Sequence, residues 1–310
     1  MVFLPEGNLL VTAENSFYLR NISTLEEARV QGVVLEARAV VCDSRHNLIV
    51  DLGFTRGMIP HSEGALGIDN GSTRDIAIIS KVNKPVCFIV DGFIRQSDGS
   101  LQPILSRRAA QEQCRTQYLQ KLAAGDIIRG RVTHLEAFGA FVDIGCGLPS
   151  LIPIDQISVS RISHPRDRFT VGDELFAVVR SVEAQGRICL THKELLGSWE
   201  ENANLFSSGE TVAGIIRSVE EYGVFVELTP NLAGLAEPFG NVTIGQHASV
   251  YIKSILPEKM KIKLVLVDAF EANYSTPPIR YFRTEGHMDS WIYSPASSRK
   301  VIETVFDGNA

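Results

Sequence analysis

The chain has 310 residues, a length of about two average domains or three to four small ones. With 45% hydrophobic and 21% charged residues it has the composition of a globular protein, which excludes wholesale disorder and collagen-like repeats. No segment approaches the ~18–20 consecutive apolar residues that cross a bilayer. The N-terminus lacks the basic start and unbroken apolar run of a signal peptide. We therefore expect a folded, cytoplasmic protein with no membrane partner.

Five cysteines and seven histidines are scattered along the chain without the close spacing of a disulfide framework or a zinc site. We therefore predict no disulfide, no metal site and no cofactor. The formal net charge is −6, so only a local surface of the chain could hold a nucleic acid. This charge argues against a strong non-specific nucleic-acid binder.

Residues 1–31 form a predicted N-terminal accessory segment. Its pattern favours strands followed by a helix over residues 24–30, because Ser23 and Glu26 have the spacing of a capping box. Residues 32–110 then show five short apolar runs separated by turn residues, which predicts a small barrel. The five runs are residues 32–41, 47–53, 57–60, 86–94 and 102–106.

A clear internal repeat follows, because residues 125–144 and 209–228 align without a gap. Each copy continues into a second similar block, so we place two further barrels at residues 125–197 and 209–268. In the middle unit the alternation of apolar and polar residues predicts five strands. These are residues 126–135, 138–145, 149–153, 173–183 and 186–191.

Helical patterns over residues 106–122 and 191–206 connect the units, with linkers placed at residues 111–124 and 198–208. In the second pattern Leu195, Trp199 and Phe206 fall on one stripe, which predicts packing against a barrel. Residues 269–310 form a predicted C-terminal accessory segment. Aromatic runs on both sides of residues 285–286 favour a hairpin there.

The second strand of the middle unit carries an informative alternation. Successive side chains of a strand face opposite sides, so Ala140 and Val142 point inward while Phe141 and Asp143 point outward. A large apolar ring is unusual on an outer face. The last unit repeats the pattern, with Phe225 and Glu227 outward.

A second ring begins each of these strands. Phe138 and Tyr222 are each followed by a glycine that permits a bulge, which would aim both rings of a unit onto the outer face. Such a pair suits single-stranded RNA, because bases of any sequence stack on rings at ~1–3 kcal/mol each. Alternatively, the rings cap the barrel or contact a neighbouring unit. The predicted RNA-binding set is Phe138, Phe141, Arg131, His134 and Arg187 in the middle unit, and Tyr222, Phe225, Lys253 and Lys261 in the last.

These motifs resemble the S1 RNA-binding domain family. The resemblance rests on G-D-x-x-x-G-x-V from Gly125, F-G-A-F-V-D from Phe138 and G-R-I-C-L-T-H-K from Gly186. It is strong over residues 125–197, good over 209–267 and weak over 32–110. The chain as a whole is similar to short bacterial proteins of the ribosomal protein S1 type, with three repeats.

The resemblance implies a mainly β chain of tandem five-stranded OB-fold barrels, joined by short helices and flanked by small accessory segments. It implies RNA contacts through Phe138, Phe141 and Arg187, with Tyr222, Phe225 and Lys261 corresponding in the last unit. The family often has a histidine in its third-strand motif, where this chain has Pro153 and Glu237, so we expect weaker phosphate binding.

The first unit departs furthest from the family pattern, because Asn47 and Leu48 stand where rings would be expected. In resembling proteins such degenerate leading copies dock on other proteins. The resemblance therefore implies contact between residues 32–110 and proteins of the small ribosomal subunit.

Three functions are compatible with the sequence. We favour a single-stranded RNA (mRNA) binding protein of the translation apparatus. The alternatives are an RNA-binding regulator of transcription or RNA turnover, and a protein-interaction module whose aromatic faces are buried. We do not expect an enzyme, since the chain lacks G-x-x-x-x-G-K-[ST], H-E-x-x-H, G-x-S-x-G and G-x-G-x-x-G motifs.

Charge limits the expected RNA affinity. Residues 125–197 contain eight Lys or Arg against nine Asp or Glu, and residues 209–268 contain five against seven. Because neither unit is basic, we expect two weak sites that gain affinity by being linked in one chain.

Overall fold

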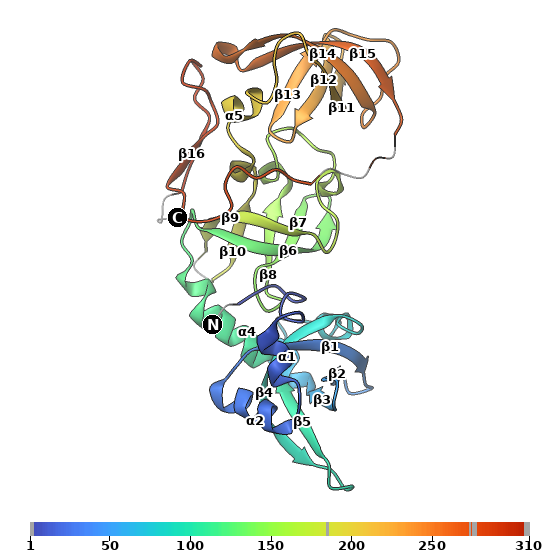
Figure 1. Ribbon diagram of the computed structural model, residues 1–310, viewed down its shortest axis with the longest axis vertical. Coiled ribbons are helices and arrows are strands. Elements are labelled where there is room, and N and C mark those ends of the chain that lie inside the picture. The colour runs from blue at the N-terminus through green and yellow to red at the C-terminus, as the bar shows by residue number, and fades with distance from the viewer. Residues whose placement is uncertain (1–2, 184–185, 273, 275–277, 307–310) are drawn as a thin grey trace. The chain divides into compact units, whose positions relative to one another are not determined.

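A computed structural model describes residues 3–183, 186–272, 274 and 278–306 of the chain, and three closed five-stranded barrels account for most of them (Figure 1). The predicted fold class, mainly β with tandem OB-like barrels joined by short helices, is confirmed. Parts of the predicted terminal segments, residues 1–2, 273, 275–277 and 307–310, lie outside the described residues, as do residues 184–185. No helix in the described part of the chain is long and apolar enough to cross a bilayer.

The chain folds into two compact units. The first comprises Met1–Leu122, Arg129–Arg131 and Asp143–Pro149, and the second comprises Ala123–Ile128, Val132–Val142 and Ser150–Ala310. The first barrel thus lies in the first unit, and the third barrel lies in the second. The domain boundaries given above stay predictions.

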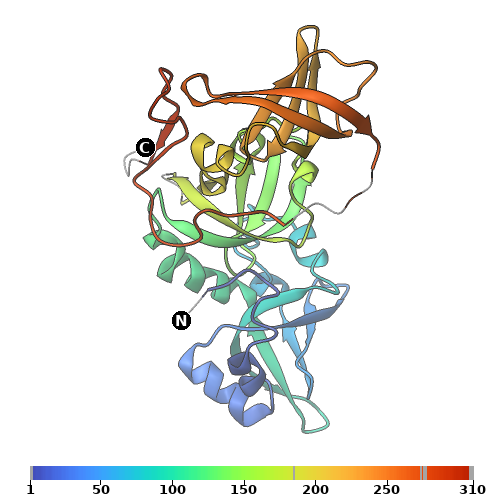
Figure 2. The same cartoon turned by 45° about the horizontal axis from the view of Figure 1, so that its top comes forward.

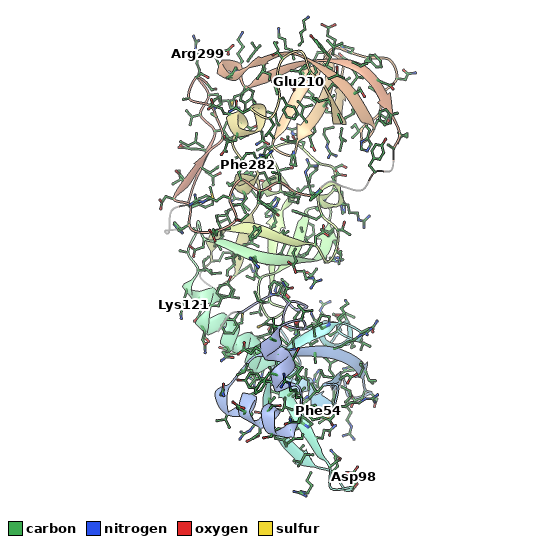
Figure 3. The ribbon with its side chains drawn as sticks, viewed as in Figure 1. Phe54, Asp98, Lys121, Glu210, Phe282 and Arg299 are labelled. Atoms are coloured by element: carbon green, nitrogen blue, oxygen red, sulfur yellow. The ribbon has the colours of Figure 1, made fainter. Side chains whose placement is uncertain are left out.

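The first barrel has the strand order β1-β2-β3-β5-β4, in which neighbouring strands are hydrogen-bonded. Its inner face is built from alternate residues of each strand, such as Leu48 and Val50 on β2, which are fully buried. The elements are β1 (Leu35–Cys42), β2 (Leu48–Asp51), β3 (Arg56–Ile59), a 3₁₀ turn η1 (His61–Glu63), α3 (Ile76–Ile79), β4 (Pro85–Arg95) and β5 (Leu101–Ser106). Asp98 lies at the tip of the β4–β5 hairpin (Figure 3).

The second and third barrels repeat this order of strands along the chain. Their inner faces again consist of buried apolar residues, among them Val142 and Val226, which have no exposed surface. The second barrel consists of β6 (Ile127–Glu136), β7 (Gly139–Asp143), β8 (Pro149–Pro153), β9 (Glu174–Val182) and β10 (Ile188–Thr191). The third consists of β11 (Thr211–Glu220), β12 (Gly223–Thr229), β13 (Leu232–Ala236), β14 (His247–Leu256) and β15 (Lys261–Phe270).

The N-terminal segment is helical, and the strands predicted there are wrong. It forms α1 (Ala13–Tyr18) and α2 (Ile22–Gln31). The second helix begins earlier than predicted because Asn21, rather than Ser23, caps it. The Asn21 side chain accepts from the backbone N–H of Thr24 at 3.0 Å, and the Thr24 hydroxyl accepts from the N–H of Asn21 at 3.3 Å.

The helical connections occur where the sequence predicts them, but the second is interrupted. The first is α4 (Arg107–Gln117), and the second consists of a 3₁₀ turn, η5 (Lys193–Leu196), followed by α5 (Trp199–Ala203). Gly197 separates these two pieces with a left-handed φ of +85°, and Ser198 restarts the helix with a capping box. Leu195 and Trp199 are buried in the core of the second unit, which confirms the predicted packing.

The C-terminal segment crosses the second barrel in both ribbon views (Figures 1 and 2). The predicted hairpin about residues 285–286 is wrong, because this backbone pairs with the barrel instead: Ile127 donates to the carbonyl of Gly286 at 3.1 Å. A hairpin does form further on, between β16 (Ser290–Ile292) and β17 (Glu303–Val305). Trp291 and Phe306 join the core of the second unit there.

Buried His192 ties the second barrel to this segment. Its Nδ1 donates to the carbonyl of Ile157 at 2.8 Å, so its Nε2 accepts from the Tyr281 hydroxyl at 3.0 Å. Burial disfavours the charged ring and lowers the pKa of His192 from 6.5 to about 4. The folded state therefore binds this proton less readily than the unfolded state does.

We predict that His192 makes the second unit less stable as the pH falls from 6.5 towards 4. Its contribution is complete above pH 6.5 and is lost at ~1.4 kcal/mol per pH unit, because only the unfolded state takes up the proton in this window. Urea unfolding followed by tryptophan fluorescence reports on this unit, since both tryptophans, Trp199 and Trp291, lie in its core. The wild type should show a steeper loss of stability than His192→Gln between pH 6.5 and 5. Equal slopes would contradict this role.

Candidate nucleic-acid interface

Phe138 and Phe141 form an open aromatic pair on the outside of the second barrel. Phe138 precedes β7 and is 56% exposed, while Phe141, within β7, is half-buried. The ring centroids lie 5.9 Å apart with an interplanar angle of 88°, so the edge of one ring meets the face of the other. The structure therefore brings together Phe141, which strand alternation predicts to face outward, and Phe138, which a bulge at Gly139 is predicted to aim onto the same face.

Tyr222 and Phe225 reproduce this pair on the third barrel. Tyr222 is 66% exposed and precedes β12, and Phe225 lies half-buried within that strand. Their centroids are 6.2 Å apart at 89°. Two barrels of one chain thus present ring pairs with nearly the same geometry.

A glycine after the first ring lets each pair form. A Cβ on Gly139 would lie 2.5 Å from the carbonyl oxygen of Ile152, and one on Gly223 would lie 2.4 Å from that of Ala236. The strand that follows each exposed ring therefore approaches its neighbour too closely for any side chain.

The predicted cations of the second barrel separate into two groups. His134 is exposed on β6 with its ring centroid 6.2 Å from that of Phe141, and its Nε2 lies in hydrogen-bond contact with Oε1 of Glu136 at 2.6 Å. Arg187 is exposed at the start of β10. Arg131 instead points to the N-terminal segment, where its guanidinium donates to the backbone carbonyl of Glu6 at 3.3 Å.

In the third barrel the strand register aligns a lysine with the rings. Phe225 pairs with Leu235 on β13, and Leu235 pairs with Lys263 on β15. Side chains in such a row share one face, so Lys263 and Lys261, two residues earlier, lie on the outer face that carries Phe225. Lys253 is exposed on β14, which is not a neighbour of β12. Lys263 lies outside the predicted RNA-binding set.

The two carboxylates predicted beside the rings are not exposed. Asp143 and Glu227 are only 2% and 5% exposed. Asp143 accepts from three backbone N–H groups, those of Glu6 at 2.7 Å, Gly145 at 2.8 Å and Gly147 at 3.0 Å. Burial and the charge of Glu6 nevertheless raise the pKa of Asp143 above its ordinary value.

Glu227 lies between two arginines of the second unit. Its carboxylate accepts from Arg168, which comes from the loop between β8 and β9, and from Nε of Arg217 at 2.8 Å. All three side chains are less than one-tenth exposed. The carboxylate is therefore neutralised by its own neighbours.

A cavity of about 670 Å³ opens beside this group. Arg166, Arg168, Arg217 and Arg280 line it, together with Phe282, which lies on the C-terminal segment (Figure 3). Nε of Arg168 is buried and has no hydrogen-bond partner among the described residues. No local sequence signal identifies this cavity.

In the first barrel, the positions equivalent to the rings differ from those predicted. Leu48 is fully buried, so it cannot occupy the outer position. The register Val41↔Ile49 corresponds to Ser218↔Phe225, each directly after a bulge in the first strand. Ile49 therefore occupies the position equivalent to Phe225, and His46, three residues earlier, occupies the position equivalent to Tyr222.

Comparison with known proteins identifies the second barrel. Residues 121–193 match the S1 RNA binding domain family. The chain carries an S1 RNA-binding domain. The family resemblance seen in the sequence is thereby confirmed, and the Phe138–Phe141 pair lies within the S1 domain.

The chain is also similar, over most of its length, to small ribosomal subunit proteins. The chain is 30% identical over 264 residues to bS1 of Leuconostoc lactis, covering 82% of this chain and 57% of that protein. It is 28% identical over 288 residues to bS1 of Mycolicibacterium smegmatis, covering 86% and 57%. The chain thus spans just over half the length of these relatives. A solved multidomain protein with nucleic acid binding domains from Streptococcus pneumoniae covers 78% of this chain and 75% of its own, at 15% identity and a TM-score of 0.26.

We predict that Glu227→Gln strongly destabilises the second unit, because Arg168 of the S1 domain and Arg217 would remain buried without their counter-charge. Removing one partner of a buried pair costs ~3–5 kcal/mol, and Asp167, 3.6 Å from Arg217, favours the lower end of that range. Urea unfolding followed by tryptophan fluorescence measures the loss. Glu136→Gln, which removes the exposed pair with His134 in the same unit, should leave the midpoint nearly unchanged. Equal midpoints for the two variants would show that Glu227 has no such role.

Proposed function

We propose that the chain binds single-stranded RNA on the outer faces of the S1 domain and the third barrel, where bases stack on the two ring pairs. The observation that supports this most directly is the repetition of one geometry, with centroid separations of 5.9 and 6.2 Å and near-perpendicular rings. A structural role alone would not require the same exposed aromatic pair on two barrels.

Stacking requires rings that solvent and ligand can reach. Phe138 and Tyr222 are both more than half exposed, so neither is covered by another part of the described chain. This exposure favours RNA binding over a module whose aromatic faces are buried within the chain. Each accessible ring face can receive one base, whatever the sequence of the RNA.

The cations near the rings are few, which predicts modest affinity and a shallow salt dependence. His134 on β6 and Arg187, just before β10, are exposed in the S1 domain, as are Lys261 and Lys263 on β15 of the third barrel. Each contact with a phosphate of a single strand adds about 0.7 to the magnitude of the slope of log affinity against log salt. Two such sites in one chain increase affinity because the second binds at a high effective concentration.

The names of the relatives support a role in translation. The bS1 proteins are components of the small ribosomal subunit by name. We infer that this chain likewise associates with the small subunit and holds mRNA there, with the first barrel contacting ribosomal proteins. Regulation of transcription or RNA turnover is the alternative.

RNA binding can be tested by fluorescence anisotropy with labelled pyrimidine-rich RNAs of about 6 and about 30 nucleotides, which fit one barrel or span two. Phe138→Ala combined with Phe141→Ala should cost the S1 domain roughly 2–6 kcal/mol of binding free energy if each ring stacks a base. The same holds for Tyr222→Ala combined with Phe225→Ala in the third barrel. The long RNA should bind more tightly than the short one, and either double variant should abolish this advantage.

Phe54→Ala is the matched control for these variants. Phe54 is also exposed, at 39%, but it follows β2 of the first barrel, which carries neither ring pair (Figure 3). It should leave the affinity unchanged. If the wild type does not bind either RNA at low salt, or if both double variants bind as the wild type does, the proposal is wrong.

Association with the ribosome has its own test. The full chain should co-sediment with purified small ribosomal subunits in a sucrose gradient, including when both ring pairs are replaced, because the first barrel is the proposed contact. A chain that binds RNA in solution but stays at the top of the gradient would favour the regulator instead.

A further inference from the structure

Three potential metal ligands converge in the first barrel. His46 lies in the turn between β1 and β2, His61 begins η1, and Asp75 precedes α3. Nδ1 of His46 is 3.3 Å from Oδ2 of Asp75, and Nε2 of His61 is 2.7 Å from Oδ1. One ligand atom from each residue lies within 4.8 Å of the other two.

The surrounding structure holds these side chains in place. Asp43 accepts from the backbone N–H of Asn47 at 2.9 Å and from its side-chain amide at 2.9 Å, which closes the turn that carries His46. Oδ1 of Asn47 then accepts from the backbone N–H of His61 at 2.9 Å. The two histidines are thus linked through one asparagine, before any ion is bound.

The third ligand is fixed by the barrel core. The carbonyl of Asp75 accepts from the N–H groups of Ile78 and Ile79, both at 2.9 Å. Ile78 is fully buried in the core of the first barrel. The short helix therefore anchors Asp75 beside the histidines.

The donor set has a definite chemistry. Two imidazole nitrogens and a carboxylate oxygen are ligands that Zn²⁺ accepts at about 2.0–2.2 Å, which places neighbouring ligands of a tetrahedral ion roughly 3.3 Å apart. The distance from Nδ1 of His46 to Oδ2 of Asp75 already has this length. The distance from Nε2 of His61 to Oδ1 of Asp75 must increase slightly. All three side chains are 38–49% exposed, so water or a further ligand can complete the coordination.

We propose that the first barrel binds one divalent transition-metal ion of the Zn²⁺ class through His46, His61 and Asp75. His46 stands at the position that Tyr222 occupies in the third barrel. The position that carries a proposed base-stacking ring in the third barrel therefore carries a metal ligand in the first. Ile49 pairs with Met58 in the first barrel as Phe225 pairs with Leu235 in the third, so this face combines an apolar surface with a metal site.

The proposal can be tested on the full chain after removal of metal with a chelator. Calorimetric titration with Zn²⁺ should show one equivalent bound per chain, and Co²⁺ should give the visible absorption of a site with nitrogen and oxygen ligands. His61→Gln and Asp75→Asn should each weaken binding by at least ~10–100-fold, the loss already typical of residues that only orient a ligand. His287→Gln is the matched control, because this histidine also contacts a carboxylate, Asp126, at 2.7 Å.

A measurement on the wild type avoids any effect of substitution on folding. In nitrogen-15 spectra of the histidine side chains, Zn²⁺ should shift the ring signals of His46 and His61 and leave those of His134 and His287 unchanged. The proposal is overturned if the wild type shows no stoichiometric site, or if binding survives His61→Gln. It is also overturned if the signals of all histidines shift alike, since that describes adventitious binding.

Discussion

Closure of the five-stranded barrel decides which side chains this chain can present to a partner. Every strand of a closed barrel has one face in the core and one outside, so a binding residue can occupy only alternate positions. Val142 and Val226 are fully buried, while Phe141 and Phe225, one residue earlier, reach the outer face. The residue at an outer position can differ between barrels without disturbing the core. The first barrel has Ile49 where the third barrel has Phe225.

The formal charge of a domain is a poor guide to the charge of its binding face. Asp143 and Glu227 make both repeats appear acidic, yet each is enclosed by its own hydrogen-bond donors. Glu6 in the first unit is also buried beside its own hydrogen-bond donors, since Nε of buried Arg107 donates to its carboxylate at 2.7 Å. Burial alone would raise the pKa of Glu6, but Arg107 and Lys81 outweigh it and hold the pKa well below its ordinary value. Several of the acidic residues that are counted in the net charge are therefore buried, where they are hydrogen-bonded or paired with arginine.

Strands and rings could be predicted because their signals are local. The strand predicted over residues 149–153 is β8, Pro149–Pro153. Period-two alternation predicts the outward position of Phe141 and Phe225, and the glycines that follow Phe138 and Tyr222 predict that these rings join them. The features that the sequence predicted wrongly, the exposed carboxylates and the C-terminal hairpin, depend on partners that are distant in the chain. Arg168 is 59 residues from Glu227, and the backbone around His287 pairs with that around Asp126, 161 residues away.

The histidine cluster belongs to the same class of distant contacts. His61 and Asp75 are 14 residues apart, a spacing that indicates nothing until β1, β2 and α3 are in place. Capping is a finer example, because the predicted cap, Ser23, lies only two residues after the actual cap, Asn21. Only the folded backbone shows that Asn21 makes the reciprocal bonds.

The return of the C-terminal segment imposes an order on how the protein is made. Trp291, Tyr293 and Phe306 share one core with Trp199 and with strands of the second and third barrels. A nascent chain emerges from its N-terminus and folds its domains in that order. The first barrel can close once β5 has been synthesised, whereas the second unit must wait for Phe306, with part of its apolar core exposed until then. During synthesis the second unit is therefore the part that needs protection from aggregation.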